Sequence, residues 1–188
     1  MGKYGKWVTY LWLAFVVAFW TYALIFEMEL TPESLAEYLK KFSNYILVAY
    51  ALFTVLRAFT LIPNMTVVLV GTLILPGRFW TLLIISVIGL LASSSIIYFF
   101  GEEMGLDVIL RKKFPDKEEY IKRQLDKYGD WIVFFWGFLP VVPSDLLSFV
   151  LGIVKYKYWK FILFYGLSHF ISYAVIIKFG EEFWKWVF

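Results

Sequence analysis

The chain has 188 residues, of which 61% are hydrophobic and 22% are aromatic, and its formal net charge is +3. A soluble domain is typically about 45–50% apolar by a similar count, so this composition predicts a protein that has lipid as its solvent. There is no cysteine and only one histidine, which excludes disulfides, cysteine nucleophiles and metal sites built from thiolates or several histidines.

The first apolar segment predicts an N-terminal transmembrane helix within residues 1–44. It extends from Trp7 to Phe26, about 20 residues, and follows Lys3 and Lys6. The apolar core of a signal peptide is usually only about 7–15 residues long, and no small-residue cleavage pattern follows this segment. We therefore expect a membrane helix that is retained in the protein.

A short amphipathic helix is predicted next, lying at the membrane interface. Thr31 is a suitable N-cap, and Pro32 suits the first helical position. A helix with one apolar face lies in the headgroup region. The side chains that form this face are those of Leu35, Tyr38, Leu39 and Phe42.

Residues 45–103 predict a broken helical hairpin followed by a spanning helix. An apolar run, interrupted only by Arg57, ends at Pro63, and the short apolar stretch 64–75 follows. A helix of about twelve residues rises only about 18 Å, whereas the hydrocarbon core is roughly 30 Å thick. The hairpin either re-enters the membrane from one side or spans it with both arms, and residues 79–100 are long enough to cross.

The second half of the chain repeats this layout after a polar segment. Residues 104–130 are strongly charged and are expected outside the membrane, on the cytoplasmic side. Residues 131–182 predict a second hairpin, broken at Pro140 and Pro143, and a spanning helix over 161–179. Residues 183–188 form a short amphipathic tail.

Regular spacing between the halves indicates an internal duplication. Pro63 and Pro143 are 80 residues apart, Gly71 and Gly152 are 81 apart, and the tetrapeptide FGEE occurs at 100–103 and again at 179–182. A fixed offset of this kind is typical of repeats. The FGEE glycine is expected to permit a left-handed helix end in each copy.

The two repeats are predicted to be inverted. Each crosses the membrane once or three times, so the second begins on the opposite side, as in many transporters. Twelve Lys and Arg residues then share a side with the N-terminus, against about five on the other side. The positive-inside rule therefore predicts a cell-membrane protein with a cytoplasmic N-terminus and an external C-terminus.

The two proline breaks are the candidate substrate sites. Irregular backbone at membrane depth is tolerated only inside protein or beside a water-filled cavity. We expect Asn64 and Ser144 to cap the short helices that follow the breaks, with both helix N-termini meeting near the middle of the membrane. Their free N–H groups favour an anionic guest such as a phosphate.

Two charged residues flank these breaks and have open alternatives. A charge within lipid costs roughly 2.5–3.5 kcal/mol on insertion scales, so Arg57 and Asp145 each need a partner or water. They pair with each other if the hairpins meet, and Asp145 is also a candidate proton carrier. Otherwise Arg57 snorkels to the interface and Asp145 is a helix-start acid near the surface.

Three groups of residues form the predicted site, in which we expect no catalytic residue and no metal. Ser93, Ser94, Ser95, Ser168 and Ser172 in the spanning helices favour helix packing over substrate contact. The substrate-contacting candidates are Arg57, Asn64, Thr66, Ser144, Asp145 and Ser148; the breaks are Pro63, Pro140 and Pro143; and the packing glycines are Gly71, Gly89, Gly152 and Gly166.

The stretches RAFTLIPNMTVVLVGTLILPG and FLPVVPSDLLSFVLG, with the small-residue helices after them, resemble the DedA family of SNARE-associated, VTT-domain membrane proteins. The resemblance implies paired re-entrant hairpins and movement of a phospholipid or polyprenyl phosphate across a bilayer. Family members often carry an arginine shortly before the second break, where this chain has Gly137-Phe138-Leu139. Many also place an acid in the first hairpin, where this chain has Arg57, so the resemblance supports a proton-coupled mechanism only weakly.

The function that these observations favour is transport of a phosphate-bearing lipid between leaflets by a flippase or scramblase. A secondary transporter of a small ion or anionic solute and a non-catalytic assembly factor are the alternatives. An enzyme is not expected, because Ser168 and His169 are adjacent and do not share a helix face. The expected partners are membrane lipids, with no nucleic acid and no cofactor.

Overall fold

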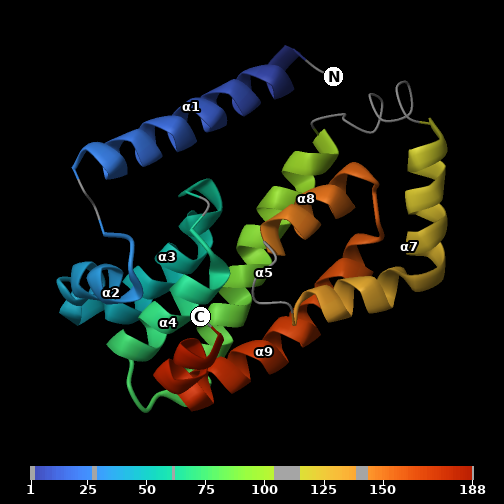
Figure 1. Cartoon of the computed structure of the whole chain (residues 1–188). Helices are drawn as coiled ribbons and strands as arrows, with labels where there is room; N and C mark the ends of the chain where they lie inside the picture. Colours follow the sequence, from blue (N-terminus) through green and yellow to red (C-terminus); the bar gives the residue numbers. More distant parts are fainter. Residues whose placement is uncertain (1–2, 27–28, 61, 104–114, 139–143, 188) are drawn as a thin grey trace. The chain divides into compact units, whose positions relative to one another are not determined.

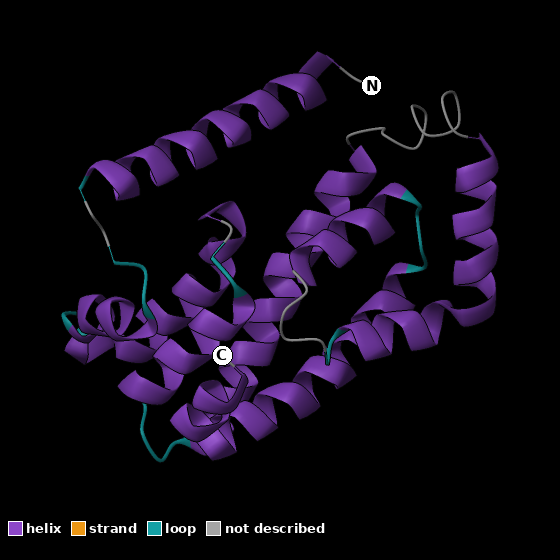
Figure 2. Cartoon of the chain, in the orientation of Figure 1, coloured by secondary structure: helices purple, strands orange, loops and turns teal. Residues whose placement is uncertain are grey.

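The computed structural model describes residues 3–26, 29–60, 62–103, 115–138 and 144–187, and no strand occurs among them. Figures 1 and 2 show that helices joined by short turns account for nearly all of this part of the chain. The all-helical prediction is therefore confirmed for the described residues. The elements are α1 (Lys3–Ile25), α2 (Pro32–Lys40), η1 (Ser43–Tyr45), α3 (Ile46–Thr60), α4 (Asn64–Ile74), α5 (Phe79–Glu103), α7 (Pro115–Trp136), α8 (Ser144–Ile153) and α9 (Tyr158–Val187).

Three helical segments are long and apolar enough to cross a membrane. Within the described residues they are Ser43–Thr60, Phe79–Gly101 and Tyr158–Gly180, close to the expected apolar runs. The shorter apolar helices are Ala14–Ile25, Asn64–Ile74 and Ser144–Ile153. α1 is continuous over 23 residues, and its membrane crossing stays a prediction.

The chain divides into two compact units. The α3–α4 unit comprises Leu13–Ser93 and Phe170–Phe188, and the α7–α8 unit comprises Met1–Trp12 and Ser94–His169. Each unit therefore contains one of the two short apolar helices, α4 or α8, and part of each of the long helices α5 and α9.

In the α3–α4 unit, α2 begins where the sequence predicts but packs differently. Thr31 Oγ1 accepts a hydrogen bond from the Ser34 backbone N at 3.3 Å, and Pro32 is the first helical residue. Leu35 is buried against Val70 of α4, with Leu39 packed beside them. The face expected to meet lipid is thus partly covered by protein. Tyr38 and Phe42, which share that face, stay 46% and 58% exposed.

Tyr50 lies at the centre of this unit. Its ring is fully buried in a cluster with Ile62, Val67 and Leu82. Its hydroxyl donates to the Val67 carbonyl at 3.2 Å and lies 2.8 Å from Ser86 Oγ. A Cβ on Gly71 would lie 2.5 Å from that hydroxyl, so only glycine lets α4 approach α3 this closely.

The two FGEE glycines have different reasons to be glycine. Gly180 has φ 49 and interrupts the helical geometry of α9, as predicted. Gly101 lies inside α5, which continues to Glu103, so the prediction of a left-handed helix end is wrong there. A Cβ on Gly101 would lie 2.5 Å from the Phe149 carbonyl oxygen of α8, so close helix packing is the reason for this glycine.

The boundary expected at residue 130 lies inside a helix. α7 extends from Pro115 to Trp136, so the polar segment and the apolar stretch that begins at Trp131 form one continuous element. Residues 104–114 of the predicted polar segment lie outside the described residues, as do Pro140 and Pro143.

Candidate functional site

Arg57 is buried inside the α3–α4 unit, with only 2% of its surface exposed. Its Nη2 donates to Ser93 Oγ of α5 at 2.9 Å, and Nη1 lies 3.5 Å from the Ile62 carbonyl oxygen. Ser93 Oγ in turn donates to the Leu90 carbonyl. The guanidinium therefore lies beside the backbone that leads into α4 and does not snorkel to the surface of its unit.

The first break differs from the expected capping pattern. Pro63, not Asn64, occupies the N-cap position of α4, and no side chain caps the helix. Asn64 is the first helical residue and is buried, and Thr66 in the same turn is half-buried. The prediction that Asn64 is the N-cap is wrong because Pro63, with φ −58 and ψ 141, already provides the extended residue that precedes the helix.

The second short helix begins at Ser144, which is its first helical residue, so the prediction that Ser144 is the N-cap is wrong as well. The Ser144 carbonyl accepts a hydrogen bond from Ser148 Oγ at 3.2 Å, and Ser148 is fully buried. Asp145 lies in the first turn of α8 and is half-buried. An acid in this position interacts favourably with the helix dipole. Arg57 and Asp145 belong to different units, and their pairing stays a prediction, as does the meeting of Asn64 with Ser144.

Gly137 stands six residues before Pro143, as Arg57 stands six residues before Pro63. A Cβ on Gly137 would lie 2.0 Å from Ser168 Oγ and 3.0 Å from His169 Cε1. His169 is 2% exposed, and its Nδ1 lies 2.9 Å from the Tyr165 carbonyl oxygen. Nδ1 also lies 3.3 Å from Ser168 Oγ, so the expectation that these adjacent side chains point apart is wrong. The polar side chains of α9 thus occupy the space that a side chain at position 137, just after α7, would need.

The remaining predicted packing glycines lie on the short and long helices. A Cβ on Gly89 would lie 1.9 Å from Thr54 Oγ1, so α3 and α5 approach closely there. Gly152 is buried near the end of α8, and its carbonyl accepts from the Lys155 backbone N at 3.1 Å. Gly166 is buried in α9.

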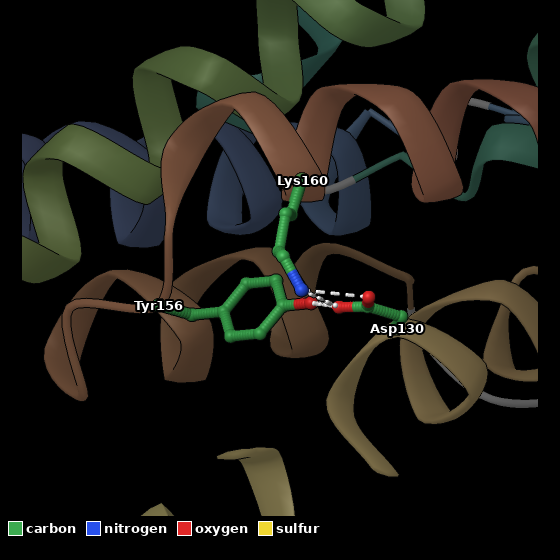
Figure 3. A network of polar contacts seen from close by, with 3 residues as sticks. All are labelled: Asp130, Tyr156 and Lys160. Carbon is green, nitrogen blue, oxygen red and sulfur yellow. Dashed lines mark hydrogen bonds and ion pairs between the residues drawn. The ribbon is translucent and has the colours of Figure 1, made fainter. Parts of the chain in front are cut away.

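A polar cluster that the sequence did not reveal joins three elements of the α7–α8 unit (Figure 3). Lys160 Nζ of α9 lies 2.9 Å and 2.7 Å from the two carboxylate oxygens of Asp130 on α7. The Tyr156 hydroxyl, from the turn between α8 and α9, donates to Asp130 Oδ1. The side chains of Lys160 and Asp130 are 27% and 32% exposed, so water reaches the pair.

The cluster shifts the pKa values of its acidic members. Burial acts to raise the pKa of the Asp130 carboxyl, but the hydrogen bonds from Lys160 and Tyr156 and the charges of Lys160 and Lys157 outweigh it, so the pKa lies below its ordinary value. Burial and the neighbouring Asp130 carboxylate raise the pKa of the Tyr156 hydroxyl. At neutral pH the cluster therefore holds an ionised carboxylate and a neutral phenol.

The local backbone explains how Tyr156 reaches Asp130. The Lys155 backbone N donates to the Gly152 carbonyl, and the Tyr156 backbone N donates to the Leu151 carbonyl, which is the Schellman pattern of a helix end. Lys155 takes the left-handed conformation, with φ 55. A Cβ on Gly129 would lie 2.8 Å from Tyr156 Cε2, so glycine there lets the ring lie against α7. An acid at the end of a charged stretch and a lysine in the first turn of a spanning helix were the only signals in the sequence.

The described residues include no group of three or more His, Asp or Glu side chains placed to hold a metal ion.

Comparisons with known proteins identify a family. The VTT domain model matches residues 61–182, which begin just before the first break and end at the second FGEE. The comparison with curated proteins finds no match, and the comparison with solved structures finds none either. Since one family model covers more than half of the chain and the described part holds three long apolar helices, the protein is a member of the VTT-domain family, the DedA or SNARE-associated membrane proteins.

Proposed function

We propose that this protein moves a phosphate-bearing lipid, a phospholipid or polyprenyl phosphate, between the leaflets of the cell membrane as a flippase or scramblase. The observation that carries this proposal is the buried position of Arg57 within a helix long and apolar enough to span a membrane. An ionisable residue at membrane depth is costly and is usually functional. Membership of the VTT-domain family supports a role in membrane transport.

The arrangement around Arg57 suits a phosphate. Its guanidinium approaches the carbonyl of Ile62, two residues before α4 begins, so a permanent cation lies beside the segment that leads into the N-terminus of α4. Both features favour an anion, and an arginine binds phosphate oxygens through several N–H groups at once. We propose that the head group exchanges with Ser93 for contact with Arg57 while the lipid tails stay in the bilayer.

The proposal includes two inverted repeats, each with a re-entrant hairpin. α4 has 11 residues and α8 has 10, so each rises only about 15–17 Å, half of a hydrocarbon core. Helices this short reach the middle of a membrane without crossing it, and each follows a proline-containing segment of the chain. Because these residues lie on the two short helices, we propose that they contact the substrate: Asn64, Thr66, Ser144, Asp145 and Ser148.

Transfer of a fluorescently labelled phospholipid in vesicles that contain the purified protein tests this function. We expect Arg57→Ala to slow transfer by at least about tenfold, since even one lost charge-assisted contact is worth roughly 1.5–3 kcal/mol. Arg57→Lys keeps the charge but loses the planar guanidinium, so its transfer rate should lie between those of the wild type and Arg57→Ala. Ser93→Ala, which removes one hydrogen-bond partner of Arg57 but not the cation, is expected to retain most of the activity.

Wild-type transfer in Arg57→Ala would remove the proposed site. Uptake of inorganic phosphate or another small anion without lipid transfer would favour a solute transporter instead. We also propose that the chain is not an enzyme, so mass spectrometry should recover the transferred lipid chemically unchanged.

A further inference from the structure

The cluster of Asp130, Tyr156 and Lys160 has the composition of an occupied anion site. Two donors, an ammonium and a phenol, converge on one carboxylate, and they come from separate elements of the α7–α8 unit (Figure 3). A phosphate oxygen accepts the same kinds of hydrogen bond as a carboxylate oxygen. The protein's own acid therefore occupies a position that an external phosphate would fit.

The surroundings of the cluster are those of a membrane–water interface. Trp131 and Trp159, the neighbours of Asp130 and Lys160, are each 61% exposed, and Tyr158 is 37% exposed. Exposed tryptophan and tyrosine gather at the level of lipid head groups. The apolar segment Tyr158–Gly180 begins here, which places Lys160 in the first turn of a candidate membrane span.

The charge around the cluster favours an anion. Lys127, Lys155 and Lys157 are exposed on the elements that carry Asp130 and Tyr156, and Asp126 is the exposed acid nearest in sequence. Basic residues at the membrane surface attract anionic lipid, with an energy that falls as salt screens it. Because the Asp130–Lys160 pair is partly exposed, its own stability is small and an incoming phosphate competes with it.

We propose that Lys160 and Tyr156 form a head-group site for an anionic lipid with an exposed phosphate, and that Asp130 is an internal competitor for that site. This site shares no residue with the one proposed around Arg57. In the context of the proposed function it would load the lipid that the protein moves, and only this loading role rests on the proposed function. Binding itself is independent of movement and is measured separately.

The test is binding of dihexanoyl phosphatidic acid to the full chain in detergent micelles, measured by titration calorimetry. Asp130→Asn keeps the shape of the side chain and removes the competing charge, so we expect about twofold to fivefold tighter binding. Asp126→Asn removes an exposed acid one helical turn earlier and is expected to leave binding unchanged. Lys160→Gln should weaken binding, and the gain should vanish in the double variant Asp130→Asn/Lys160→Gln.

Tyr156→Phe provides a second measurement that does not disturb the ion pair. It removes one donor and retains Asp130 and Lys160, so binding of phosphatidic acid should weaken. An equal gain in Asp126→Asn, or a gain that persists without Lys160, would show a general charge effect and overturn the proposal. Binding of inorganic phosphate as tight as that of the lipid would also overturn it, since the ligand would then be a free anion.

A lipid-transfer defect with normal phosphatidic acid binding would count against the proposed function alone. Normal lipid transfer combined with unchanged binding in Asp130→Asn and Lys160→Gln would count against the head-group site alone. Dihexanoyl phosphatidylcholine is the matched ligand control, because its choline ammonium balances the charge of its phosphate. It should bind no more tightly to Asp130→Asn than to the wild type.

Discussion

In both units a side-chain contact, here called a tie, joins the helix before the short apolar helix to the long helix after it. The two ties use different chemistry. In the α3–α4 unit, beside the hydrogen bond from Arg57 to Ser93, a neutral pair joins the two helices: Tyr50 of α3 contacts Ser86 of α5, and both are buried. In the α7–α8 unit the tie is ionic: Asp130 of α7 contacts Lys160 of α9 at a partly exposed position. Tyr50 and Asp130 are 80 residues apart, the same offset as the two breaks.

Burial accounts for this difference. A hydroxyl pair is satisfied with two or three hydrogen bonds and loses little when it leaves water, whereas an ion pair needs strong compensation. The Asp130–Lys160 ion pair is therefore stable where water still reaches it, and the Tyr50–Ser86 hydroxyl pair is stable where water does not. It follows that the Asp130–Lys160 pair responds to pH, salt and competing anions, whereas the Tyr50–Ser86 pair does not.

The largest expected effect is that of Tyr50→Ala. Truncation of a buried aromatic side chain usually costs about 3–5 kcal/mol, and here the Val67 carbonyl and Ser86 also lose a hydrogen-bond partner. Thermal unfolding of the purified protein in detergent is the measurement. Tyr45→Ala, at a position 72% exposed, is the control and should change the unfolding free energy by less than about 0.5 kcal/mol. Similar values for both variants would remove Tyr50 as the centre of its unit.

The second prediction concerns the acid side of the pH profile. The folded pKa of Asp130 is lowered, so its tie contributes stability above the unfolded pKa and loses it as pH falls through the folded value. The contribution is at most about 1 kcal/mol because the pair is partly exposed. Unfolding followed from pH 7 to pH 3 should therefore show a smaller acid-induced loss in Asp130→Asn than in the wild type.

The same profile has an alkaline arm. The pKa of Tyr156 is raised in the folded protein, so its contribution is complete below the ordinary tyrosine pKa of about 10 and is lost as pH rises through the folded value. Tyr156→Phe should flatten the profile above pH 10, and Asp126→Asn should leave both arms as in the wild type. An unchanged acid arm in Asp130→Asn would contradict the ionic character of this tie.

The sequence predicted those features that depend on composition and local pattern. The helical fold, the start of α2 after Thr31 and the three apolar segments follow from hydropathy, capping residues and proline positions. The family was indicated by the resemblance of the two proline-containing stretches, and the VTT domain match confirms it. The interruption of α9 at Gly180 follows from the same local rules.

Features that depend on contacts between distant residues were missed or misassigned. Gly101 and Gly180 share one tetrapeptide, yet the close approach of Phe149 explains the first and backbone conformation the second. Asp130 and Lys160 are 30 residues apart, and no local rule connects them. Arg57 was recognised as unusual from its type, but its contact with Ser93 depends on how α3 packs against α5.

The smallest expected effect concerns the ends of the two short helices. After α4 the chain turns through Leu75-Pro76-Gly77-Arg78, where Gly77 has φ 75 and the Arg78 backbone N donates to the Leu75 carbonyl at 3.2 Å, a type II turn with glycine at its left-handed position. After α8 a lysine, Lys155, occupies the left-handed position. A residue with a Cβ is strained in this conformation by about 1–2 kcal/mol, and replacement by glycine relieves the strain. Part of the stability gained is lost again, because glycine has more conformational entropy in the unfolded chain.

Lys155→Gly should therefore stabilise the protein by about 0.5–1 kcal/mol, and Lys155→Asn by less, since asparagine tolerates the left-handed region better than lysine does. Gly77→Ala is the reciprocal change and should destabilise by about 1 kcal/mol, although a Cβ there meets no atom within 4 Å, because its cost is conformational and not steric. Thermal unfolding of the three variants measures both directions. A loss of stability in Lys155→Gly would mean that contacts of the lysine side chain outweigh the strain of its backbone, and the two helix ends would then differ by selection for that side chain rather than by tolerance of strain.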